Sequence, residues 1–268
     1  MTLYFLPILV GFIGAVFASF LLNVAMRTHN GLDVIWGRSK CEFCKYPIPW
    51  YDNIPLVSYL LLGGRCRKCK NFYSIKYFLT EISAFFIFLT LFLVISYMNF
   101  GIYESIYIFK IVIILFYFSL YDILYFEIQD KFIIPIIILL IIFSGITFEV
   151  SVFQVSGADR LLGGFILALI FLIIIYFSNG KMGGGEIRLG ALIGLILGFQ
   201  KFYFAFLIGI FLATVSGILI GFINKLLIKG YDIPIFKTKI PLVPFMAIGV
   251  VFELFFKFTF NSFIYSHY

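Results

Sequence analysis

The sequence predicts an all-α, multi-pass transmembrane protein with a small cytoplasmic domain, and three observations support this prediction. Hydrophobic residues make up 63% of the 268 positions and the mean hydropathy is +1.10, a composition that requires lipid as the solvent. Apolar segments near the length of about 20 residues that spans a bilayer as a helix recur along the chain. All four cysteines and many basic residues lie in one polar stretch, 27–76.

We expect about eight membrane spans. The first is interpreted as a true span and not as a cleaved signal peptide, because no basic region precedes it. The sixth is the shortest of the eight. In chain order, the predicted spans are 3–26, 77–98, 105–123, 132–149, 160–178, 187–199, 202–224 and 241–260.

The distribution of charge predicts the orientation, because Lys and Arg accumulate in cytoplasmic loops. The stretch from Arg27 to Lys76 holds nine basic residues against three acids, so we place it in the cytoplasm and the N-terminus outside. The loops 121–131, 179–188 and 225–240 then also face the cytoplasm. Sixteen of the 20 Lys and Arg residues fall on that side, which supports the topology.

The predicted organisation is a first transmembrane helix (1–26), a cytoplasmic domain that we call the cysteine domain (27–76), and a membrane domain (77–268). The net charge of +7 is explained by membrane orientation, so nucleic-acid binding is not predicted. The sequence does not indicate an oligomeric state.

The cysteine domain has the ligand pattern of a structural metal site. Cys41 and Cys44 form one C-x-x-C pair, and Cys66 and Cys69 form another. Two such pairs favour a tetrahedral zinc site with four thiolate ligands and no open position. Two disulfides are the alternative reading, but the cytoplasm keeps thiols reduced. A zinc ion would fold a small polar domain that cannot build its own core.

Two acids at predicted helix ends indicate a functional site, since ionisable groups at membrane depth are costly. Asp122 closes the third predicted span, where the helix dipole disfavours an anion. Glu186 precedes the sixth span, and the topology places both acids at the cytoplasmic side. Glu186 and Asp130 could instead cap helix N-termini, whereas Glu127 is interpreted as a solvated loop residue.

Three glycines, Gly183, Gly184 and Gly185, directly precede Glu186. Glycine permits unusual backbone angles and close approach, so this segment could admit an extended peptide and present Glu186 to it. Glycines at 190, 194 and 198 would let another helix pack closely and hold Glu186 near Asp122. Two close carboxylates do not both ionise easily, so we predict that they share a proton and activate water, as in aspartic proteases.

The ordered motifs of this chain resemble the bacterial type IV prepilin peptidases, which are leader peptidases and N-methyltransferases of type IV pilus and type II secretion systems. The resemblance covers nearly the whole chain. It is carried by "GAVFASFLLNVAMR", "CEFCKYPIPWYDNIPLVSYLLLGGRCRKC", "KYFLTE", "YDILYFEIQD", "MGGGEIRLGALIGLILG" and "KIPLVPFMAIG".

The resemblance implies that Asp122 is the first catalytic acid and that Glu186 stands in the place of the second. The family segment reads G-x-G-D, whereas this chain has glutamate, which moves the carboxylate by roughly 1.5 Å in a chemistry that is sensitive to about 1 Å. Leu124 stands where many relatives carry another aspartate, at a position that is not catalytic.

The resemblance further implies a bacterial inner-membrane enzyme that cleaves prepilins and pseudopilins and then methylates the new N-terminus from S-adenosylmethionine. It associates methylation with the cysteine domain, including Gly63 and Gly64, and makes Asp130 a residue that supports the site.

Two alternatives remain open at this stage. An ion-coupled transporter would also bury carboxylates, but it predicts midplane acids and repeated halves, which we do not find. A weakened or inactive relative that acts in pilus or secretion assembly would explain Glu186.

Overall fold

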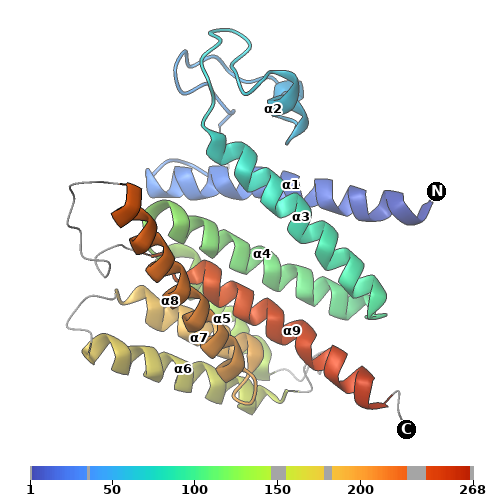
Figure 1. Cartoon of the computed structure of the whole chain (residues 1–268), viewed down its shortest axis with the longest axis vertical. Coiled ribbons are helices and arrows are strands. Elements are labelled where there is room, and N and C mark those ends of the chain that lie inside the picture. The colour runs from blue at the N-terminus through green and yellow to red at the C-terminus, as the bar shows by residue number, and fades with distance from the viewer. Residues whose placement is uncertain (1, 35–36, 146–154, 178–182, 228–239, 266–268) are drawn as a thin grey trace. The chain divides into compact units, whose positions relative to one another are not determined.

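The computed structural model describes residues 2–34, 37–145, 155–177, 183–227 and 240–265. Within these ranges the chain is helical, and two isolated β-bridges are its sole extended pairing, so the all-α prediction is confirmed for the described residues. The elements (Figure 1) are α1 (Thr2–His29), η1 (Trp50–Asn53), α2 (Val57–Leu61), α3 (Ile75–Tyr97), α4 (Ile102–Tyr125), α5 (Asp130–Gly145), α6 (Gly157–Phe177), α7 (Gly185–Leu197), α8 (Phe202–Leu227) and α9 (Val243–Tyr265).

Eight of these helices coincide with the eight predicted spans to within a few residues. Five of them, α1, α3, α4, α6 and α8, are long and apolar enough to cross a membrane. Helices α5 and α7 have 16 and 13 residues, and the apolar segment of α9 is Val243–Phe255. The structure therefore supports a multi-pass membrane protein with five candidate spans among the described residues, and the number eight stays a prediction. The end of the fourth predicted span, 146–149, lies outside the described residues.

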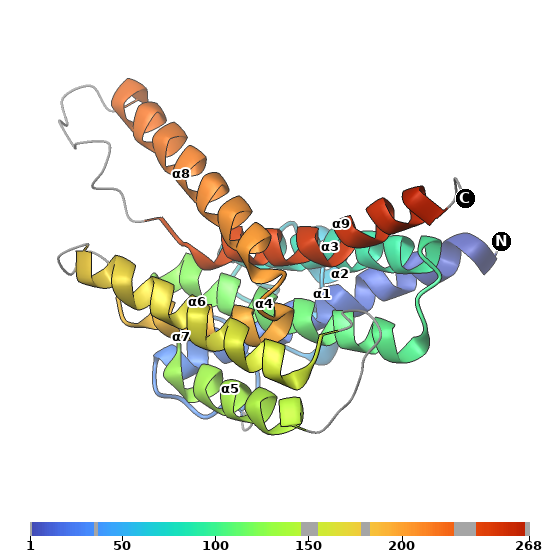
Figure 2. The ribbon, with the colours of Figure 1, turned by 90° about the horizontal axis from the view of Figure 1, so that it is seen from below.

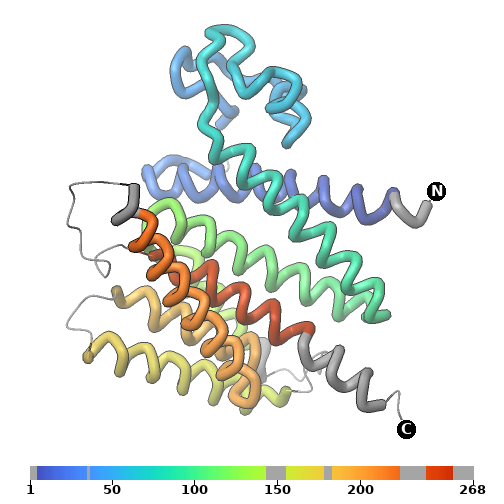
Figure 3. The backbone as a smooth tube through the Cα atoms, in the orientation of Figure 1, coloured from blue at the N-terminus to red at the C-terminus, as the bar shows by residue number. Residues whose placement is uncertain are grey.

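The chain divides into two compact units, 1–100 and 101–268. In the first unit, α1 packs against α3, and Figure 3 shows the two helices crossing. Gly14 allows the close approach, because a Cβ atom there would lie 2.5 Å from the ring of Phe88. The cysteine domain occupies the chain between these two helices.

In the second unit, α7 is the most buried helix, and its residues 192–197 are all buried. It packs chiefly against α6, and α5 also contacts it; Figure 2 shows α6 and α7 side by side. Helix α9 joins α4 to α8 and also contacts α7.

The predicted glycine stripe of α7 does pack closely, and its partner is α6. A Cβ atom at Gly194 would lie 2.2 Å from the carbonyl oxygen of Gly163, and one at Gly190 would lie 2.5 Å from the ring of Phe171. Such backbone contact between helices is typical of small residues in membrane proteins. The close contacts of the stripe therefore fix the middle and the C-terminal end of α7 to α6.

We predict that Gly194→Ala destabilises the membrane domain, because the new methyl group meets backbone atoms that cannot rotate away. The expected loss of unfolding free energy is about 1–3 kcal/mol, typical of overpacking, measured by thermal or denaturant unfolding in detergent. Gly217→Ala in α8 is the matched control, because its methyl group would meet only the flexible tip of Ile240. Equal stability of the two variants would contradict the packing account.

Candidate functional site

Asp122 lies in the last turn of α4 and is 7% exposed. Its Oδ2 atom accepts a hydrogen bond of 2.8 Å from the backbone N–H of Val243. Val243 is the first residue of α9 and has no partner for this N–H inside its own helix. The carboxylate of Asp122 therefore caps a helix that lies 121 positions later in the chain.

This contact explains how a carboxylate is tolerated at the C-terminal end of α4. The dipole of α4 disfavours an anion there, but the N-terminus of α9 carries partial positive charge that favours one. The backbone N–H of Leu242 also donates to Asp122. The sequence prediction identified Asp122 but not this partner, although the partner belongs to the motif "KIPLVPFMAIG".

Glu186 lies in the first turn of α7 and is partly buried. Its charge acts on Asp122, so the structure brings the two predicted acids into electrostatic range. We call Asp122 and Glu186 the acidic pair. An N-terminal helix position also stabilises the Glu186 carboxylate, as the capping interpretation expects.

The three glycines before Glu186 have different surroundings. Gly184 has φ −67° and ψ −8°, ordinary helical angles, so unusual backbone geometry does not explain it. A Cβ atom at Gly185 would lie 3.0 Å from Ile128, and one at Gly183 would lie 3.4 Å from Oε2 of Glu186. Close approach is therefore the observed role at Gly185, while Gly184 faces open space.

Asp130 begins α5 and forms an ion pair with Arg188 of α7. Both side chains are substantially exposed, so the pair contributes little to stability, but it links α5 to the turn that carries Glu186. The partner Arg188 was not anticipated from the sequence. Nor was the buried hydrogen bond that the hydroxyl of Tyr117 donates to Gln129, which joins α4 to the start of α5.

The four cysteines form one cluster, as their spacing predicts. The sulfurs of Cys41 and Cys69 are 3.8 Å apart, those of Cys44 and Cys66 are 4.0 Å apart, and all four lie within 4.8 Å of one another. A tetrahedral ion with metal–sulfur bonds of about 2.3 Å places its sulfurs about 3.8 Å apart. These distances fit a metal ion and are too long for disulfide bonds.

The two C-x-x-C pairs are built as equivalent turns. Isolated β-bridges, Lys40 with Pro47 and Arg65 with Phe72, flank the two turns. The residue after each second cysteine, Lys45 or Lys70, has φ near +60°: 57° and 60°. Their N–H groups donate to the carbonyls of Cys41 and Cys66. The repeated pattern C-x-x-C-K was visible in the sequence and is the signal of this shared turn.

The cluster favours a thiolate at Cys66. Burial alone would raise the pKa of this thiol, but the backbone N–H groups of Cys69 and Lys68 donate to its sulfur and lower the pKa to about 6. Thiolates are the form in which cysteines bind metal ions. The cluster could therefore hold a metal cation.

Gly63 and Gly64 form the turn before the second C-x-x-C pair, with φ of +59° and +67°. A Cβ atom at Gly64 would lie 2.8 Å from the ring of Tyr59, whereas a Cβ atom at Gly63 would have no neighbouring atom within 4 Å. Tyr59 in turn stacks on Phe78 of α3, with ring centroids 4.9 Å apart. Gly64 thus allows the cysteine domain to place Tyr59 against α3.

Comparisons with known proteins agree with this geometry. Residues 12–95 match the bacterial peptidase A24 N-terminal domain, and residues 109–218 match the type IV leader peptidase family. The chain is similar to the prepilin leader peptidase/N-methyltransferase of Vibrio cholerae serotype O1, 29% identical over 200 residues that cover 72% of this chain and 75% of that protein. It is also similar to the protein of the same name from Bacillus subtilis, 27% identical over 245 residues that cover 89% of each chain. No solved structure matches.

The helical membrane architecture and these matches define a multi-pass membrane peptidase. The chain belongs to the type IV leader peptidase family. The first matched region contains the whole cysteine cluster, and the second contains both members of the acidic pair.

We predict that Gly64→Ala destabilises the cysteine domain more than Gly63→Ala. Both alanines must adopt an unfavourable positive φ, which costs about 1–2 kcal/mol of conformational free energy. Only the alanine at position 64 also displaces Tyr59. Thermal unfolding and retained metal content of the two purified variants measure the difference. Indistinguishable variants would show that the Tyr59 contact contributes nothing.

Proposed function

We propose that the protein is an aspartic-type endopeptidase that removes the leader peptide of type IV prepilins and pseudopilins. The supporting observation is the acidic pair: a buried carboxylate on α4 interacts with a second carboxylate on α7 in a member of a leader peptidase family. The names of its relatives supply the substrate class.

In the proposed mechanism the acidic pair holds one proton between two carboxylates, because like charges at close range cannot both ionise easily. The ionised member accepts a proton from water as the water attacks the scissile carbonyl, and the protonated member donates to the departing amine. Backbone N–H groups at the start of α9 hold Asp122 in place. Gly183 and Gly184 would leave room for extended substrate backbone beside Glu186. Gly185, which lies close to Ile128, and Asp130, which pairs with Arg188, would support this turn.

The proposed location is the bacterial inner membrane, with the N-terminus outside and the acidic pair at the cytoplasmic face. The excess of Lys and Arg in the stretches 27–76, 179–188 and 225–240 supports this orientation. We propose eight crossings, and the domain organisation 1–26, 27–76 and 77–268. The scissile bond would then lie at the boundary where an apolar pilin helix leaves the membrane.

Two further assignments belong to the N-terminal unit. The four cysteines would hold a structural Zn²⁺ ion, since the set is closed and all sulfur. The second activity in the relatives' names, N-methylation, would act on the new amino terminus. S-adenosylmethionine supplies an electrophilic methyl group for such a reaction, and Gly63 and Gly64 belong to the region that we associate with it.

We predict that Asp122→Asn lowers leader cleavage by about 10²–10⁴-fold, the usual contribution of a general acid or base. Asparagine retains an oxygen that can accept the Val243 N–H, so the variant is expected to fold. Glu127→Gln is the matched control, because it removes an exposed carboxylate five residues away. The assay follows cleavage of a pilin precursor in membranes, and normal cleavage by Asp122→Asn would refute the assignment.

The glutamate at position 186 makes a weakened or inactive relative the second candidate. A comparison of Glu186→Asp with Glu186→Gln distinguishes an active peptidase from a weakened or inactive relative. If the native protein is active, Glu186→Gln lowers the rate of leader cleavage by about 10²–10⁴-fold, and Glu186→Asp keeps measurable cleavage. An inert native protein that gains cleavage through Glu186→Asp would instead favour the weakened or inactive relative.

We predict about one zinc ion per chain in purified protein, measured by elemental mass spectrometry. Cys41→Ser removes a buried ligand and is expected to lower the zinc content and the stability of the cysteine domain, because metal binding supplies folding free energy there. The contrary result is metal-free protein whose intact mass shows two disulfides.

A further inference from the structure

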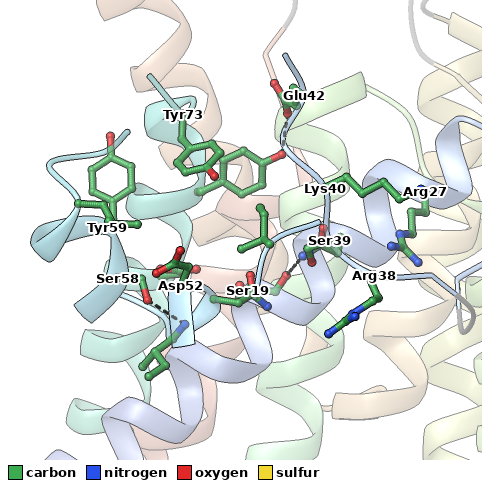
Figure 4. Close-up of a pocket in the computed structure, with 17 residues that line it drawn as sticks. Ser19, Arg27, Arg38, Ser39, Lys40, Glu42, Asp52, Ser58, Tyr59 and Tyr73 are labelled. Atoms are coloured by element: carbon green, nitrogen blue, oxygen red, sulfur yellow. Dashed lines mark hydrogen bonds between the residues drawn. The ribbon is translucent and has the colours of Figure 1, made fainter. Parts of the chain in front are cut away.

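Helix α2 of the cysteine domain is polar on its inner side. Ser58 and Tyr59 line a polar cavity of about 280 Å³ between α1, α3 and the cysteine domain (Figure 4). Ser58 is buried, and its hydroxyl donates to the carbonyl of Tyr51 and accepts from the N–H of Ile54. These two hydrogen bonds satisfy the hydroxyl inside the N-terminal unit, so α2 turns its polar groups inward.

The outer side of the same segment carries large apolar side chains. Leu60 and Leu61 are 67% and 82% exposed, and Val57, which is also exposed, shares their helix face. Trp50 and Tyr51 of the neighbouring η1 are exposed as well, Trp50 to 76%. We call these five residues the apolar patch, and none of them lines the cavity. A cluster of exposed large apolar side chains marks an interaction surface.

The attachment of α2 to the helices beside it indicates what covers this patch. The N–H of Leu56, which precedes α2, donates to Oε2 of Glu81 in α3 over 2.8 Å, and the hydroxyl of Ser19 in α1 also bonds to Glu81. Both α1 and α3 are long and apolar enough to cross a membrane. The start of α2 is therefore attached to the sides of two candidate spans, and not to their ends.

The cations of α1 and α3 show how deep this attachment lies. Arg27, in the last turn of α1, follows Ser19 by eight residues. Lys76, in the first turn of α3, precedes Glu81 by five residues. At 1.5 Å per residue these separations are about 12 and 8 Å along the helix axes. Lysine and arginine near the end of a span reach the membrane surface, and the headgroup layer there is roughly 5–7 Å thick. The start of α2 therefore lies where the headgroups meet the hydrocarbon core.

The chain that follows α2 is strongly basic. Residues 62–76 contain no acid and five cations, which are Arg65, Arg67, Lys68, Lys70 and Lys76. Among the described residues, one of the five forms an ion pair, Arg67 with Asp52. Most of the positive charge of this stretch is therefore not balanced by acids of the described chain. A basic stretch beside an apolar helix face is typical of segments that bind anionic phospholipids.

We propose that α2 and η1 insert the apolar patch into the cytoplasmic leaflet of the membrane, and that the basic stretch 62–76 binds the phosphate groups of anionic phospholipids. Inward serine and outward leucines fit a helix that lies between a polar cavity and lipid, the reverse of a helix that faces water. The cysteine domain would then be partly embedded in the membrane surface. The choice of leaflet rests on the proposed orientation, whereas leader cleavage plays no part in it.

The test uses Trp50 as a probe of its own surroundings. The chain has two tryptophans, so Trp36→Phe leaves Trp50 as the single one. The full-length variant is reconstituted into nanodiscs of anionic phospholipid whose acyl chains are either brominated or unmodified. A ring that lies about 5–10 Å into the interface is within reach of the bromines, so we expect them to lower the Trp50 emission about twofold or more. Iodide added to the water should have little effect.

Leu61→Trp and Leu32→Trp form the matched pair, each in a chain that also carries Trp36→Phe and Trp50→Phe. Both replace a well-exposed leucine, but Leu32 follows the end of α1 and lies outside the apolar patch. We expect the bromines to quench the Leu61→Trp variant and iodide to quench the Leu32→Trp variant. Equal quenching of the two positions would overturn the proposal. So would a Trp50 that neither quencher reaches, because protein would then cover it.

Brominated nanodiscs of zwitterionic phospholipid test the basic stretch. Weaker quenching of Trp50 than in anionic lipid supports headgroup binding, and equal quenching refutes it. Should the variants misfold, the unmutated chain can be labelled from a phospholipid that carries a photoreactive diazirine in its acyl chain. Adducts within 50–61 support the insertion, and adducts on α1 and α3 without any in 50–61 refute it. Neither readout depends on leader cleavage, so the membrane insertion and the proposed function can fail separately.

Discussion

The constraint on which the membrane domain depends is that the buried carboxylate of Asp122 needs hydrogen-bond donors. Asp122 satisfies it by accepting the backbone N–H of Val243 at the start of α9. A lysine or arginine partner would neutralise the acid, whereas a helix N-terminus offers partial positive charge and hydrogen bonds without supplying a competing ion. This contact ties the start of α9 to the last turn of α4.

The second half of the acidic site is positioned by packing. Glycines in α6 and α7 let the two backbones touch at Gly163 and Gly194, near the C-terminal end of α7, and this contact fixes the helix that carries Glu186. Gly185 lies against Ile128, and Arg188 pairs with Asp130, which connects this turn to the segment that follows α4. Asp122 is thus held by its hydrogen bond to the start of α9, and Glu186 is held by the packing of α7 and its first turn. Together these contacts bring the two acids into electrostatic range.

Local features were predictable from the sequence, and long-range pairings were not. Helix positions follow from runs of apolar residues, and the cysteine cluster follows from ligand spacing, because each is encoded within a few tens of positions. The hydrogen bond from Val243 to Asp122 spans 121 positions, and hydropathy carries no information about which helix end an acid will cap. The glycine stripe of α7 predicted a close neighbour but could not specify α6. The cavity beside Glu81 depends on how the cysteine domain folds over α1 and α3, which no spacing rule describes.

The most direct test of the central claim is infrared spectroscopy of the protonated carboxylic acid in the chain at neutral pH. If Asp122 and Glu186 share one proton, the native protein shows a carboxylic acid band that is lost or shifted in both Asp122→Asn and Glu186→Gln. If the two acids titrate independently, replacing one leaves the signal of the other unchanged, and that result would contradict the paired-acid account.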